Sequence, residues 1–123
     1  MGKFVIKGTK NGGFKFDLLA VNMQVIASSQ TYKSLRTAKA GIASVVRNCK
    51  AAVEDQTVEP VVAVKCPKFE VYKDKAGEFR FRLRAANGQN ICHSEGYSAK
   101  AGCLNGIDSI GRNAPDAEIT KEE

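Results

Sequence analysis

An internal duplication constrains the fold of this chain more than any other feature of its sequence. When the sequence is shifted along itself by 65 residues, positions 3–53 match positions 68–118 at 19 of 51 positions without a gap. Chance would give roughly three matches at ordinary residue frequencies. A repeat of this length corresponds to one supersecondary unit that buries its apolar face against a neighbouring copy. The chain is therefore expected to fold from two similar units in contact.

Each copy has the residue pattern of three strands followed by one helix. Between residues 13 and 20, apolar and polar residues alternate with the period of a half-buried strand, and the second copy repeats this pattern. The pair Asn87-Gly88 is typical of a tight hairpin turn. Strands are predicted at 3–8, 13–20, 24–29 and 89–94, helices at 34–50 and 98–113, and a short final strand at 117–120.

One repeat of this size is too small to bury a stable core by itself, so the two copies are expected to share one. We predict an α+β fold in which two β-β-β-α(-β) units share one antiparallel sheet, with both helices on one face. The expected arrangement is a single domain over residues 1–123, with repeats at about 3–55 and 68–120. The connector, at about 56–67, contains the valine-rich stretch from Val58 to Val64, which is β-prone.

The retained residues resemble those of the YegP-like family of small bacterial proteins, which are of the UPF0339 type. Each copy contains G-x-F-x-F-x-L-x-A-x-N-x-Q-x-I, followed by S-x-x-Y and then by G-I-x-S-x-x-x-N. The resemblance covers residues 3–53 and 68–119. It implies one continuous sheet in which the last strand of each unit is exchanged to the other unit, and it implies no activity, cofactor or catalytic residue. The connector here is longer and more apolar than in the family.

The charge of the chain is uneven. The net charge is +6, and residues 1–65 carry ten Lys or Arg against four Asp or Glu, whereas the remainder is balanced. A basic half suits nucleic acid or another polyanion, although moderate positive charge also simply aids solubility. No export signal or apolar span is recognisable, so we expect a cytoplasmic monomer without membrane contact. The four cysteines are then expected to be free thiols.

No catalytic, metal or cofactor site is predicted. Cys92 and His93 are neighbours on a predicted strand, so their side chains are expected on opposite faces and do not by themselves form a dyad. Cys92, His93 and Cys103 are conceivable metal ligands, but the cysteines lack the close pairs of zinc sites. An enzyme is therefore the least favoured class.

The strongest binding candidate is a basic sheet face in the second copy. Arg80, Arg82 and Arg84 alternate with buried apolar positions and so share one face of one strand. The candidate binding residues are Lys7, Lys15, Tyr72, Arg80, Arg82 and Arg84. Two readings stay open, since such a face could contact phosphates or could be a solvated surface with cross-strand ion pairs. A protein-interaction or assembly module, using sheet edges or the apolar connector, is the alternative function.

Overall fold

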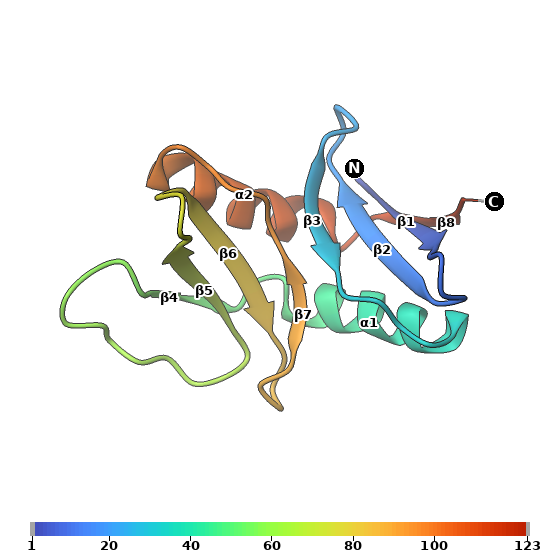
Figure 1. Cartoon of the computed structure of the whole chain (residues 1–123), viewed down its shortest axis with the longest axis horizontal. Coiled ribbons are helices and arrows are strands. Elements are labelled where there is room, and N and C mark those ends of the chain that lie inside the picture. The colour runs from blue at the N-terminus through green and yellow to red at the C-terminus, as the bar shows by residue number, and fades with distance from the viewer. Residues whose placement is uncertain (1, 123) are drawn as a thin grey trace.

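The computed structural model describes residues 2–122 and contains eight strands and two helices (Figure 1). In chain order the elements are β1 (Lys3–Gly8), β2 (Phe14–Leu19), β3 (Val25–Ser29), α1 (Leu35–Asn48), β4 (Ala52–Asp55), β5 (Lys68–Lys73), β6 (Phe79–Arg84), β7 (Asn90–His93), α2 (Lys100–Asn113) and β8 (Glu118–Lys121). Both copies therefore have the predicted order of elements. The predicted helices and several predicted strands are one or two residues too long at their ends.

All eight strands form one sheet in the order β4-β5-β6-β7-β3-β2-β1-β8. The two halves join at its centre, where β3 and β7 pair antiparallel and Ser28 lies opposite His93. The final strand of each copy belongs to the other half, because β4 pairs in parallel with β5 and β8 pairs in parallel with β1. The shared sheet and the strand exchange are thus confirmed. The sheet is antiparallel except at these two outermost pairs.

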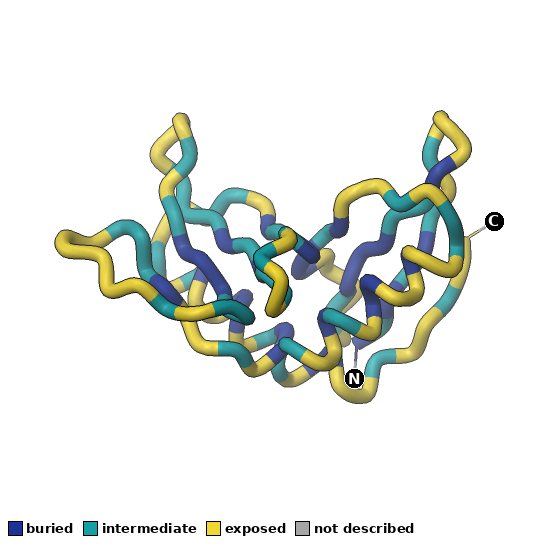
Figure 2. The backbone as a smooth tube through the Cα atoms, turned by 90° about the horizontal axis from the view of Figure 1, so that it is seen from below, coloured by how far each residue is buried: buried dark blue, intermediate teal, exposed yellow. Residues whose placement is uncertain are grey.

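One face of the sheet carries the hydrophobic core, and both helices pack on it. Phe4, Phe16, Phe69 and Phe81 are fully buried there. They form two equivalent edge-to-face pairs, with ring centroids 5.8 Å apart for Phe4 and Phe16 and 6.0 Å apart for Phe69 and Phe81. Each helix contacts strands of both halves, since α1 packs on β2 and β7 while α2 packs on β6 and β3. Figure 2 shows buried backbone in both halves of the molecule.

The retained glycines in the helices, Gly41 and Gly106, mark a close approach of helix to sheet. A Cβ atom on Gly106 would lie 2.6 Å from Tyr97 Oη and 2.9 Å from Phe81 Cε2. Tyr97 stacks on Phe81 with ring centroids 6.5 Å apart, and Gly41 and Tyr32 repeat the arrangement in the other half. The helix can approach this closely only because glycine has no side chain, which offsets its low helix propensity.

The retained serines also have a structural role. Ser94 Oγ accepts a hydrogen bond of 2.9 Å from the backbone N–H of Phe81 and donates one of 2.8 Å to the carbonyl of Glu95. Ser29 makes the equivalent pair of bonds in the first copy. These hydroxyls satisfy backbone groups where β3 and β7 end, so their retention serves the fold.

The connector differs from its expected conformation. The β-prone stretch from Val58 to Val64 contains no strand, and the strand that follows α1 is β4, which lies earlier in the chain. Pro60 has no backbone N–H to donate to a sheet, and most of this stretch is exposed. Within the described chain, neither helix is long and apolar enough to cross a membrane.

Candidate functional site

The face of the sheet opposite the helices is polar, and the pairing register places its side chains in rows. One row crosses from β4 to β2 through Glu54, Glu70, Arg82, His93, Ser28 and Asp17. All six predicted binding residues lie on this outer face, because each alternates with core residues along its strand. The prediction that the three arginines share one face is therefore correct for the backbone arrangement.

The three arginines are held by carboxylates rather than left free. Glu70 Oε1 accepts hydrogen bonds from Arg82 Nε at 2.5 Å and from Arg84 Nε at 2.7 Å. Arg80 Nε donates to Asp74 Oδ2 at 2.6 Å. Each guanidinium is bound to its carboxylate through Nε, and the arginine side chains remain 25–36% exposed. Glu70 and Asp74 therefore offset much of the positive charge of the three arginines.

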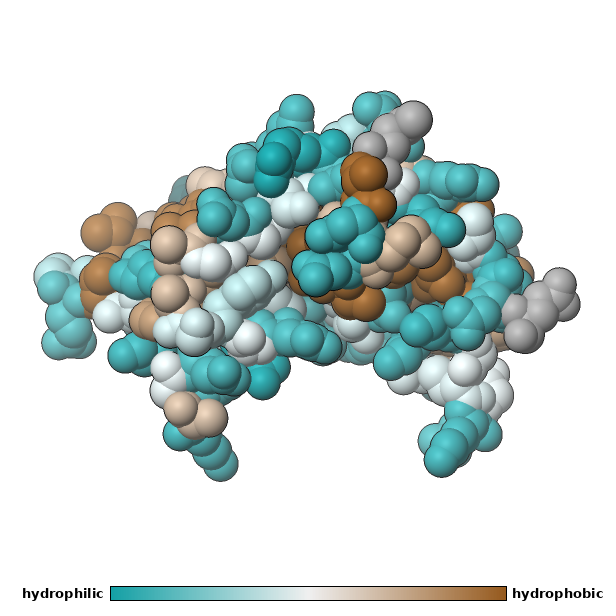
Figure 3. Space-filling model, turned by 90° about the horizontal axis from the view of Figure 1, so that it is seen from above, coloured by the Kyte–Doolittle hydropathy of each residue, from teal (hydrophilic) through white to brown (hydrophobic). Residues whose placement is uncertain are grey.

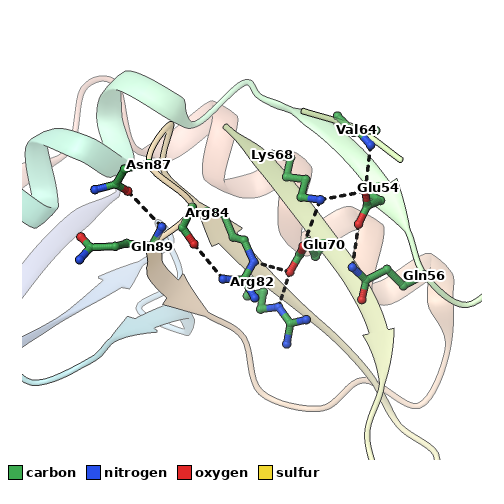
Figure 4. Close-up of polar contacts among 10 residues, drawn as sticks. Glu54, Gln56, Val64, Lys68, Glu70, Arg82, Arg84, Asn87 and Gln89 are labelled. Carbon is green, nitrogen blue, oxygen red and sulfur yellow. Dashed lines mark hydrogen bonds and ion pairs between the residues drawn. The ribbon is translucent and has the colours of Figure 1, made fainter. Parts of the chain in front are cut away.

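Glu70 also pairs with Lys68, which in turn pairs with Glu54 at the edge of the sheet (Figure 4). Lys68 Nζ lies 2.8 Å from Glu54 Oε1 and 3.2 Å from Glu70 Oε2, so one ammonium joins two buried carboxylates. Glu54 also accepts hydrogen bonds from the Gln56 amide and from the backbone N–H of Val64 in the connector. These donors, led by Lys68, lower the pKa of Glu54 to about 2. The connector therefore contacts this face at its edge and leaves the arginines open.

Burial opposes ionisation of Glu70 most strongly, but hydrogen bonds from Arg82, Arg84 and Lys68 outweigh it, so its pKa is lowered. A carboxylate whose pKa is lower in the folded than in the unfolded state stabilises the fold above its unfolded pKa. That contribution is lost as the pH falls through the folded pKa. The two glutamates therefore make the protein sensitive to acid.

We expect the free energy of unfolding to decrease as the pH falls from about 4.5, the usual value for glutamate, towards 2. Urea unfolding, followed by circular dichroism at several pH values in this range, measures the slope of the free energy of unfolding against pH. Glu54→Gln should flatten it, because a neutral amide takes up no proton. Asp116→Asn, at an exposed position, is the matched control and should keep the slope of the parent. Equal slopes in the parent and in Glu54→Gln would contradict the assignment.

The aromatic residue of the predicted face is already engaged. The guanidinium carbon of Arg82 lies 4.3 Å from the centroid of the Tyr72 ring, which is a cation–π contact. Tyr72 therefore orients Arg82 and is not an open platform for stacking a base. Together, Tyr72 and Glu70 hold Arg82 from two sides.

The two predicted lysines form a separate group on the same face. Lys7 and Lys15 are cross-strand partners on β1 and β2, and β3 and β7 lie between them and the arginines. Lys7 Nζ pairs with Asp17 Oδ2 at 3.0 Å, and this hydrogen bond raises the pKa of Lys7. Lys15 forms no ion pair within residues 2–122. The sequence analysis placed the lysines and the arginines in one binding face. It did not predict that β7 and β3 separate the two groups.

His93 lies between the two basic groups. Its pKa is lowered chiefly by burial, and then by the positive charges of Arg80 and Lys15. Both basic groups therefore act on the centre of the outer face. Sequence reasoning missed Lys68 and Glu54 as members of this surface, although Lys68 alternates with the buried Phe69 in a pattern that could have revealed it.

The Cys–His pair does not form a dyad, as predicted. Cys92 is buried on the core side, where burial raises the pKa of its thiol to about 12, whereas His93 points to the outer face beside Arg82. The four cysteines are free thiols, and Cys49, Cys92 and Cys103 are buried. Within residues 2–122, no group of three or more His, Cys, Asp or Glu side chains is placed to hold a metal ion.

The fold and this face define a class of small tandem-repeat α+β proteins with exchanged end strands and a polar, ion-paired sheet surface. The family described as "Domain of unknown function (DUF1508)" matches residues 9–55 and again 74–120. The chain belongs to this family, whose members are also called UPF0339 proteins. The predicted resemblance is thereby confirmed.

Individual relatives support the same assignment. The UPF0339 protein MS1092 of Mannheimia succiniciproducens is 39% identical over 97% of this chain and 93% of its own length. The solution NMR structure of yegP from E. coli, a protein of unknown function, has a TM-score of 0.80 at 27% identity and covers 98% of this chain and 92% of that one.

Other relatives match one repeat only. A UPF0339 protein of Treponema denticola is 57% identical over 54 residues, which are 44% of this chain and 93% of that protein. The chain spans 43% of the relative from Stutzerimonas stutzeri, at 69% identity over 48 residues. One repeat is therefore close to the full length of at least one relative.

Proposed function

We propose that the chain is a binding module that contacts the phosphate backbone of nucleic acid with the outer face of its sheet. The observation that carries the proposal is the way Arg80, Arg82 and Arg84 are held. Carboxylates bind all three through Nε, and Nη1 of Arg80 and Nη1 of Arg84 also donate to the carbonyls of Ser94 and Gly88. The guanidinium groups are therefore oriented before a ligand arrives, and each keeps at least one terminal amino group free of these bonds. An oriented guanidinium loses less side-chain entropy on binding, and its two-pronged geometry suits phosphate oxygens.

The charge balance of the face favours weak, sequence-independent contact. Lys68, Arg82 and Arg84 carry three positive charges against two on Glu54 and Glu70, so this cluster keeps one positive charge. Lys15 adds another across the sheet, and the positive surroundings of His93 support a positive potential at the centre. Because Arg82 covers Tyr72, base stacking contributes little, and backbone contacts are expected to dominate.

Fluorescence anisotropy of a labelled single-stranded oligonucleotide, repeated over a range of salt concentrations, tests this proposal. Replacing the three arginines with glutamine should weaken binding by about 10-fold or more and reduce the salt slope by about 2, because fewer counterions are released. The control removes the same charge elsewhere, by Lys33→Gln, Arg36→Gln and Lys39→Gln at exposed positions in and before α1. Equal weakening in both variants, with both folded, would reduce the effect to net charge and defeat the proposal.

Assembly through the connector is the second candidate, and exposed valines favour it. Val62 is 76% exposed, and Val58 and Val61 are each 43% exposed. Figure 3 shows apolar atoms at the end of the molecule where the connector projects. Replacing these valines with serine should convert any self-associated species to monomer in analytical ultracentrifugation. A monomer before and after the change counts against this candidate.

A further inference from the structure

A cleft lies between α1 of the first repeat and the β6–β7 hairpin of the second. It has a volume of about 420 Å³, which is within the range of small-molecule sites. Its helix side is one stripe, with Thr37, Gly41, Ser44 and Asn48 at i, i+4, i+7 and i+11. Neither repeat contains both walls, so the cleft exists only because the two halves share one sheet. It is separate from the outer face described above.

The lining of this cleft is enriched in residues that both repeats retain. Nine of its 14 lining residues are identical to the residue 65 positions away in the other copy. The polar members of that set are Tyr32, Ser44, Arg47, Asn48, Asn87 and Gln89. Because the retained residues come from opposite halves, their meeting is a consequence of the tertiary structure alone.

The fold explains most of these retained residues but not all of them. Asn87 Oδ1 accepts the backbone N–H of Gln89 in the turn, and the Asn48 amide donates to the carbonyl of Ser44. Tyr32 packs on Gly41. Arg47 and Gln89 differ, because their side chains are exposed and form no hydrogen bond or ion pair with any residue from 2 to 122. They are polar and retained in both copies, and no hydrogen bond or ion pair within the described chain accounts for their retention.

The charge in the cleft points to an anion. No aspartate or glutamate lines it, and Arg47 is its only charged lining residue. The twin of Arg47 is in a different situation, since Arg112 pairs with Asp108 at 3.0 Å one helical turn away. Ala43 replaces that aspartate in the first copy, so no carboxylate one helical turn away offsets the charge of Arg47. A guanidinium without a carboxylate partner is suited to bind a carboxylate or phosphate group.

The amides in the cleft indicate what lies beside the anion. Figure 4 shows Asn87 and Gln89 on the hairpin next to α1. The Asn87 amide nitrogen and both polar atoms of the Gln89 side chain are uncommitted within the described chain. Such groups offer a donor and an acceptor together, which complements the amide edge of a peptide bond or a pyrimidine.

We propose that this cleft binds a small ligand that carries one oxyanion, held by Arg47, and an adjacent amide-type edge, held by Asn87 and Gln89. Two sources share this chemistry, namely a short peptide with a free carboxylate and a nucleoside monophosphate. Titration of the labelled full chain by ¹H–¹⁵N NMR distinguishes them. The probes are N-acetyl-glycylglycine against its C-terminal amide, and uridine monophosphate against uridine.

The expected result is a set of shifts around Asn48, Asn87 and Gln89 with a charged probe and none with its neutral partner. Arg47→Gln should weaken this binding by about 10-fold or more, whereas Arg112→Gln should leave it unchanged and serves as the matched control. Absence of shifts at about 10 mM of both charged probes overturns the proposal. Equal affinity in Arg47→Gln overturns it too. Shifts confined to Arg80, Arg82 and Arg84 would assign the ligand to the outer face and also reject the cleft.

Discussion

Residues 1–66, expressed alone, should form a folded homodimer rather than a folded monomer. In the intact chain β1 pairs in parallel with β8, and Lys3 lies opposite Glu118. β4 pairs in the same way with β5, and Ala52 lies opposite Lys68. The fragment contains β4 but neither β5 nor β8. Its β4 can therefore complete only the β1 edge of a second copy, and two copies reproduce the eight-stranded sheet.

Analytical ultracentrifugation and thermal unfolding measure this outcome. A dimer predicts a melting temperature that rises with fragment concentration, because association is coupled to folding. A fragment of residues 1–50, which lacks β4, is the control and should stay monomeric and largely unfolded. A folded monomer of residues 1–66, with a melting temperature independent of concentration, would contradict the exchange. The single-repeat length of the Treponema denticola relative makes the same association an expectation for that protein.

Phe81→Ala should destabilise the protein by about 3–5 kcal/mol, which is the usual cost of removing a large buried aromatic side chain. Phe81 is fully buried, meets Phe69 edge to face and stacks under Tyr97. Helix α2 rests on this stack through Gly106, so the cavity lies between helix and sheet and cannot close without moving the helix. The loss arises from burial and from aromatic contacts together.

Chemical denaturation measures the free energy of unfolding of Phe81→Ala and of the equivalent variant in the first copy, Phe16→Ala. The twin should cost about the same, because Phe16 has equivalent partners in Phe4 and Tyr32. Val46→Ala, on the solvent side of α1, is the control and should change stability by no more than about 0.5 kcal/mol. Losses below about 1 kcal/mol at Phe81 would mean that this aromatic stack is not part of a rigid core.

The sequence predicts which residues lie on the candidate binding face, but it does not predict their ion pairs. Strand periodicity placed Arg82 on the outer face, since alternate residues of a strand point to opposite sides. It did not identify the partner of Arg82, because Glu70 comes from a neighbouring strand in a register that depends on the whole hairpin. A surface that is basic in sequence is therefore an ion-paired network in three dimensions, and its net charge is smaller than the run of arginines suggests.

The amino-acid sequence by itself determined the duplicated unit, the order of its elements and its core residues. These follow from local periodicity and from the match between the two copies, and both can be read along one chain. Only the tertiary structure decided which carboxylate holds each arginine, and that Arg47 of one repeat and Gln89 of the other line the same cleft. Such contacts join residues far apart in the chain, and their distances are set by how the two halves pack, which no local pattern encodes.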